Sequence, residues 1–147
     1  MVVATSNYAV NIHPGPPEYP GSHPESFAIW DGAEMFGITA HVMTARVDDG
    51  PIVAVYRFAP PVNCERMALA DLAYGYAIDV FSLVGAFCAK TDASMPHMQE
   101  EQWAPHKRTN NQFQTLCQMP ANASLDEAAL LRRACGDDLI GRVAAQA

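Results

Sequence analysis

Two side chains suited to acyl-transfer chemistry leave one short apolar segment together. Residues 8–12 (YAVNI) form an apolar run that ends at His13 and Pro14, which predicts a buried strand. Alternate side chains of a strand point to the same face, so we expect Asn11 and His13 to project together. Ligands of open α/β sheets bind at the carboxyl ends of strands. An amide and a charged imidazole at this place could stabilise an oxyanion.

A carboxylate for the same site comes from an acidic turn. Asp48 and Asp49 precede Gly50 and Pro51, between segments 36–43 and 52–58, whose composition predicts two strands. If the turn folds back beside the first strand, a carboxylate there would orient His13 or raise its pKa.

The remaining elements are expected to hold these residues in place. A loop at 14–24 contains five prolines and two glycines, so it is rigid and irregular. A short helix is predicted at 25–30, and one long helix or two shorter ones at 65–90. Residues 92–123 are polar and predicted to be irregular. Ser124 with Glu127 predicts a last helix ending near Cys135.

Size and charge narrow the class of protein. The chain has 147 residues, half of them apolar, and a net charge of −7, which suits one soluble domain that does not bind nucleic acid. No uninterrupted apolar run of about 18 residues and no signal peptide is evident, so we expect a cytoplasmic protein without membrane contact. The four cysteines are far apart and are expected to be reduced.

The order of several motifs resembles a known family. N-I-H-P begins at Asn11, a proline-rich loop with Y-P-G follows, and then come A-I-W-D-G, F-G-I-T-A-H-V-M and V-D-D-G-P-I-V. This series is similar to the formyltransferases that use 10-formyltetrahydrofolate, which act on glycinamide ribonucleotide, methionyl-tRNA or sugar nucleotides. The resemblance is close over residues 8–60, and residues 61–147 form a helical and irregular tail.

The resemblance implies a site and a reaction. Asn11, His13 and Asp48 would form the catalytic trio, and the turn formed by Arg46, Val47, Asp48 and Asp49 would contact the pterin of 10-formyltetrahydrofolate. An amine would attack the formyl carbon, and Asn11 with protonated His13 would hold the oxyanion. Since the chain is acidic, a sugar nucleotide or another small amine is favoured as acceptor.

The resemblance also implies that the chain is partial. The family places roughly 90 to 100 residues before the N-x-H strand, so residues 1–147 would form the carboxyl-terminal half of an α/β, Rossmann-like domain, with a short mixed sheet packed by helices. Without the neighbouring strands, the strand at 8–12 would have an exposed edge that a second copy or a partner chain could cover. The chain also has Gly15-Pro16-Pro17 where the family usually has a small hydroxylated residue and a Leu-Leu-Pro run.

Other interpretations remain open. The same trio could hydrolyse formyltetrahydrofolate, or the chain could be a truncated, non-catalytic relative or subunit. His41 is expected to be a packed core histidine. No local spacing of histidines fixes a pair of metal ligands, so no metal site is predicted. The cluster around Trp103, Lys107 and Arg108 could either reach an anionic substrate or dock the tail.

Overall fold

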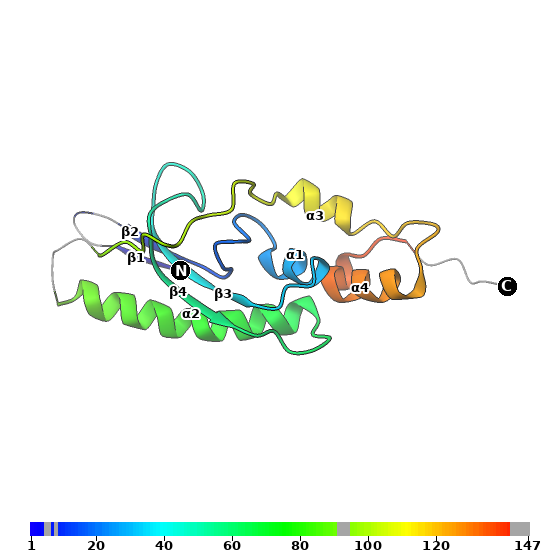
Figure 1. Cartoon of the computed structure of the whole chain (residues 1–147), viewed down its shortest axis with the longest axis horizontal. Helices are drawn as coiled ribbons and strands as arrows, with labels where there is room; N and C mark the ends of the chain where they lie inside the picture. Colours follow the sequence, from blue (N-terminus) through cyan, green and yellow to red (C-terminus); the bar gives the residue numbers. More distant parts are fainter. Residues whose placement is uncertain (5–6, 8, 91–94, 142–147) are drawn as a thin grey trace.

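The sheet that carries the predicted site has four strands. The computed structural model describes residues 1–4, 7, 9–90 and 95–141. The strands are β1 (Val2–Ala4), β2 (Ala9–His13), β3 (Phe36–Val42) and β4 (Ile52–Phe58), in the order β1-β2-β3-β4 (Figure 1). The expected α/β class is confirmed. The expected mixed sheet is corrected, because all three pairings among the described residues are antiparallel.

Strand register gives the sheet one polar and one apolar face. In the β2–β3 pairing, Asn11 lies opposite His41 and His13 lies opposite Thr39. Side chains alternate between faces, so these four residues share one face. Their neighbours Ile12 and Ala40 belong to the buried core on the other face.

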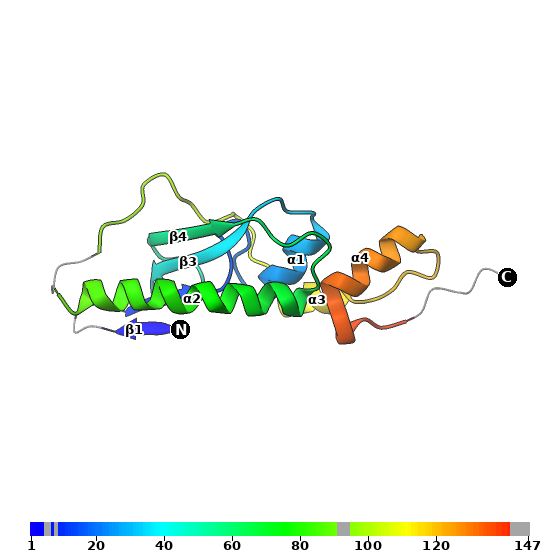
Figure 2. The same ribbon diagram turned by 90° about the horizontal axis from the view of Figure 1, so that it is seen from below.

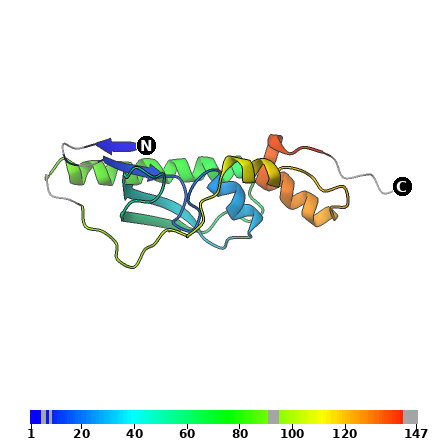
Figure 3. The same cartoon turned by 90° about the horizontal axis from the view of Figure 1, so that it is seen from above.

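Helix α2 (Arg66–Cys88) covers the apolar face (Figures 2 and 3). It is one continuous helix, and its buried residues recur at helical spacing: Leu69, Ala73, Ala77, Val80 and Val84. By length and composition alone α2 could span a membrane, although no such run was expected from the sequence. The buried stripe packs on the sheet and on α1 and α4.

The other helices extend the molecule beyond one end of the sheet. They are α1 (Pro24–Trp30), α3 (Asn110–Leu116), α4 (Leu125–Cys135) and the short 3-10 helix η1 (Gly136–Asp138). Helix α1 packs mainly on α4 (Figure 1). Four predicted elements, α1, β3, β4 and α4, lie within about a residue of their expected positions.

Two elements and one edge differ from the expectation. Helix α3 lies inside the segment predicted to be irregular, and its start is a capping box in which Thr109 and Gln112 bind each other's backbone. Strand β1 was not predicted, and its pairing with β2 means that the strand at 8–12 has no unpaired edge. Tyr8, the first residue of that predicted strand, lies outside the described residues.

Candidate active site

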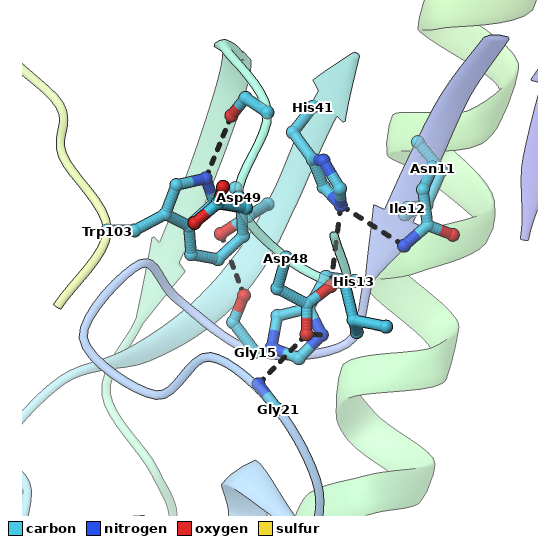
Figure 4. Close-up of polar contacts among 12 residues, drawn as sticks. Asn11, Ile12, His13, Gly15, Gly21, His41, Asp48, Asp49 and Trp103 are labelled. Atoms are coloured by element: carbon cyan, nitrogen blue, oxygen red, sulfur yellow. Dashed lines mark hydrogen bonds and ion pairs between the residues drawn. The ribbon is translucent and has the colours of Figure 1, made fainter. Parts of the chain in front are cut away.

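The acidic turn folds back onto the polar face of the sheet, as the sequence predicted. Asp48 lies with its Oδ2 3.3 Å from Nδ1 of His13 and its Oδ1 3.4 Å from Nε2 of His41 (Figure 4). The backbone N–H of Gly21 also donates to Oδ2 at 2.9 Å. The carboxylate is therefore held between two imidazoles and the proline-rich loop.

Asp48 points inward because of its backbone conformation. Its φ is 43°, in the left-handed region that Asp and Asn adopt more readily than most residues. As a result its side chain is buried, with 3% of the residue exposed, while the preceding Val47 is 73% exposed.

Asn11 is connected to the Asp48 carboxylate through the ring of His41. The Asn11 Nδ2 lies 3.2 Å from Nε2 of His41, the same nitrogen that faces Asp48. The other nitrogen, Nδ1, donates to the backbone carbonyl of Val42 at 3.1 Å, which fixes the orientation of the ring. His41 is thus a member of the polar cluster, where the sequence suggested a packed core histidine.

His13 has an acceptor at each nitrogen. Its Nε2 donates to the carbonyl of Tyr19 at 3.0 Å, and its Nδ1 faces Asp48. The residue is 4% exposed.

Burial controls the protonation of this cluster. It lowers the pKa of His13, and attraction to Asp48 and the bond to Tyr19 offset this only in part. Asp48 thus acts on the pKa of His13 in the predicted direction, but burial outweighs it and leaves that pKa below its usual value. Burial alone would raise the pKa of Asp48, but hydrogen bonding from His41, attraction to His13 and the Gly21 bond hold it below its usual value.

A segment from Glu101 to Arg108 straps across the cluster. The indole of Trp103 lies edge-on to both rings, 5.8 Å from His13 and 5.1 Å from His41 between centroids. Its Nε1 donates to the carbonyl of Gly50 at 2.9 Å (Figure 4). This indole closes one side of the imidazole pair.

Ion pairs fasten the strap at both ends. Lys107 binds Asp49 at 3.0 Å and the Val47 carbonyl, and Arg108 binds Asp31 at 3.0 Å. At the other end, Glu101 forms a bidentate ion pair with Arg57. The cations of the 103–108 cluster are thus paired within the chain, which favours the docking interpretation.

A cavity of about 210 Å³ opens at Asn11, His41 and Asp48. The turn from Met43 to Val47 forms its other wall, so Arg46, Val47 and Asp48 of the predicted pterin-binding turn lie at one cavity. Asp49 does not: it lines a separate cavity of about 430 Å³ with residues 97–99 and 101–103. The structure brings Asn11, His13 and Asp48 together, but His13 is not among the residues lining the first cavity.

Two contributors to this site, His41 and Trp103, were not predicted as site residues. His41 could have been found from register, because an antiparallel pairing that aligns the two motifs puts it opposite Asn11. Trp103 had no local signal, since the strap is fixed only by distant contacts. Among the described residues, no group of three or more His, Cys, Asp or Glu side chains is placed to hold a metal ion.

Comparison with known proteins finds a family match over the first part of the chain. Residues 1–63 match the formyl transferase family, and this segment contains all members of the polar cluster. No curated protein sequence matches the chain.

Solved structures share the fold. A sugar N-formyltransferase from Shewanella sp FDAARGOS_354 has 22% identity and a TM-score of 0.72, over 87% of this chain and 52% of that one. An N-formyltransferase from Helicobacter canadensis, in complex with folinic acid and dTDP-3-aminofucose, has 17% identity and a TM-score of 0.68, over 86% and 46%. HypX from Aquifex aeolicus, in complex with tetrahydrofolic acid, has 21% identity and a TM-score of 0.66, over 90% and 22%. This chain spans about half the length of the two N-formyltransferases.

Proposed function

We propose that this chain, whose residues 1–63 match the formyl transferase family, transfers a formyl group from 10-formyltetrahydrofolate to the amine of a small acceptor. The observation that carries the proposal is one cavity lined by Asn11, His41 and Asp48. His13 lies against Asp48, with its Nδ1 facing the carboxylate. All four of these residues also lie within residues 1–63, the part of the chain that matches the family.

The chemistry needs a donor to an oxyanion and a proton acceptor. The amine nitrogen attacks the formyl carbon, and the carbonyl electron pair moves onto oxygen. Nδ2–H groups of Asn11 at the cavity wall can donate to that oxyanion. As the oxyanion collapses, the bond between the formyl carbon and N10 of the folate breaks. The proton lost by the amine passes to N10 through the histidine–aspartate cluster, which gives the formamide and tetrahydrofolate.

The turn around Arg46 and Val47 is the proposed binding site of the pterin. Residues of this turn line the cavity next to Asp48, and Lys107 binds the Val47 carbonyl, so that the turn is fixed before the donor binds. A fixed turn lowers the entropy cost of binding. Asp49 is proposed to support the turn through Lys107 and not to contact the donor.

A sugar nucleotide is the proposed class of acceptor. The support is the fold likeness to sugar N-formyltransferases, one of them in complex with dTDP-3-aminofucose. We also propose that the protein acts in the cytoplasm, where folate-dependent donors and nucleotide sugars would both be at hand.

Binding and turnover test the proposal in two steps. Titration calorimetry with 5-formyltetrahydrofolate should show saturable binding in roughly the micromolar range typical of enzyme substrates. Transfer from 10-formyltetrahydrofolate to dTDP-3-aminofucose is then followed as formamide, with formate measured in the absence of amine to detect hydrolysis.

Two variants make the test specific. Asn11→Ala should lower the rate of transfer by about 10²- to 10³-fold, the usual effect of losing one oxyanion donor. Asp71→Asn removes a carboxylate from the exposed surface of α2 and should leave the rate unchanged. A folded chain that binds no folate, or an Asn11→Ala variant as active as wild type, would rule the proposal out.

A further inference from the structure

Trp103 separates the two histidines of the polar cluster from the second, larger cavity. Its indole lies edge-on to the rings of His13 and His41, and the same residue lines the cavity of about 430 Å³. It does not line the 210 Å³ cavity, and in Figure 4 it lies on the side of the rings away from Asn11. Without the indole, water from the 430 Å³ cavity would reach the rings.

Two backbone contacts fix the indole in this position. Its Nε1 donates to the carbonyl of Gly50 at 2.9 Å. Gly50 packs so closely on β3 that a Cβ there would overlap the carbonyl oxygen of Val42. On the strap itself, the N–H of Ala104 donates to the carbonyl of Pro17 at 2.9 Å. The indole is therefore held between the turn that carries Asp48 and the proline-rich loop.

We propose that Trp103 is a positioning residue for the reaction, which acts through His13 by keeping water away from the contact between that ring and Asp48. It deepens the proposed formyl transfer and rests on it. A polar contact is stronger where water is excluded, so the indole strengthens the hold of the carboxylate on the imidazole. Loss of the indole would loosen that hold.

The charge state of His13 reports whether water reaches it. Burial is the largest influence on its pKa and lowers it. Asp48 and the carbonyl of Tyr19 act in the opposite direction, while the charges of His41 and of the amino group of Met1 add to the lowering. Only the first of these influences depends on how well the ring is covered.

Trp103 can be replaced without changing any charge near His13. The charged side chains of the strap form ion pairs of their own: Glu101 with Arg57, Lys107 with Asp49 and Arg108 with Asp31. His106, which also belongs to the strap, is exposed. Removal of the indole should therefore act through water alone and raise the pKa of His13 toward its ordinary value of 6.5.

NMR titration of the His13 ring tests the inference without turnover, with His13→Gln to identify the ring C–H signals. Trp103→Ala should raise the pH at which these signals titrate. Trp103→Phe keeps an apolar ring between the cavity and the histidines, so its midpoint should stay near that of wild type although the bond to Gly50 is lost. Glu101→Gln weakens one end of the strap, keeps the indole and should also leave the midpoint unchanged.

The pH profile of formyl transfer should follow the titration. In the proposed reaction the histidine–aspartate cluster takes up the proton of the amine, so kcat falls as His13 becomes protonated. In Trp103→Ala the acidic limb of the kcat profile should move to higher pH by the same amount as the NMR midpoint. Trp103→Phe should keep the wild-type limb.

A midpoint that is the same in Trp103→Ala and wild type would overturn the inference. So would a Trp103→Phe midpoint raised as far as that of Trp103→Ala, because fastening of the strap and not the apolar ring would then be what matters. A midpoint that moves as expected in a chain that transfers no formyl group supports the shielding and contradicts only the proposed reaction.

Fluorescence gives an answer even if Trp103→Ala does not fold. In Trp30→Phe, Trp103 is the only tryptophan of the chain. A protonated imidazole in contact with an indole quenches its emission, so the emission should fall as pH falls through the NMR midpoint of His13. His13→Gln should remove that step. Emission that does not change through the midpoint would show that the indole does not cover the ring, and the inference would be wrong.

Discussion

At the residue scale, burial and the neighbouring polar groups shift the pKa values of the site residues in opposite directions. Asp48 is buried, which by itself disfavours its charge, yet it has donors at both oxygens. His13 has acceptors at both nitrogens, yet burial keeps its pKa low. The sequence predicted that Asn11, His13 and Asp48 would meet because strand alternation and turn composition are local signals. It could not predict the balance of charge, which depends on the strap and the loop.

The shifted pKa of His13 predicts how stability depends on pH. Because its folded pKa lies below its unfolded value of about 6.5, the unfolded chain binds the proton more readily. The stability contribution of neutral His13 is complete above about pH 6.5 and is lost as pH falls through the folded pKa. Unfolding free energy should therefore rise with pH below 6.5, by at most about 1.4 kcal/mol per pH unit for one proton.

Urea unfolding from pH 5 to pH 8 measures this slope. His13→Gln cannot take up the proton, so its curve should be shallower than that of wild type below pH 6.5. His106→Gln changes an exposed histidine and should keep the wild-type slope. Equal slopes for wild type and His13→Gln would mean that His13 does not carry the effect.

At the element scale, local signals predicted the elements that they alone determine. The turn around Gly50, the alternation of β3 and β4 and the Ser124 cap of α4 are encoded within a few residues. Strand β1 has three residues and exists through its pairing with β2. Helix α3, capped by Thr109 and Gln112, lies in a segment whose polar composition suggested a loop.

The proline-rich loop leaves no room for the residue that the family usually has after its histidine and proline. A Cβ at Gly15 would lie 2.6 Å from Nε2 of His13 and 2.7 Å from Cβ of Pro24. The Gly15 carbonyl also accepts from the buried hydroxyl of Thr39 at 2.8 Å, which pins the loop to β3. The absence of a side chain at Gly15 is therefore part of how this loop packs against His13.

Gly15→Ser is expected to destabilise the protein by about 1–3 kcal/mol, because the crowded Cβ must displace His13 or the loop. Gly75→Ala is the matched control: its Cβ meets no atom within 4 Å, and Ala is favoured over Gly inside a helix, so stability should rise by up to about 1 kcal/mol. Urea unfolding gives both values. A Gly15→Ser variant as stable as wild type would show that the loop can move away from His13 at little cost.

At the scale of the whole molecule, α2 has an apolar surface that the described fold does not cover. Met67, Tyr74 and Ile78 are each more than half exposed and lie seven and four residues apart, so they form one stripe along the helix. The strand edge that we expected to need a partner is covered by β1, which leaves this stripe as the stronger candidate for contact with another chain. We propose that a second copy of the chain covers it.

Net charge and salt make this proposal testable. Two copies of net charge −7 repel each other, so added salt should screen the repulsion and strengthen an association that depends on apolar contact. Sedimentation velocity should therefore show more dimer at 0.5 M than at 0.05 M NaCl.

Ile78→Lys should reduce both the dimer and the binding of the dye ANS while changing stability by less than about 0.5 kcal/mol, as usual for exposed sites. Ile140→Lys makes the same chemical change at an exposed position outside α2 and should leave both unchanged. Dimer that weakens as salt is added, or that survives Ile78→Lys, would show that ionic contacts or another surface hold the copies together.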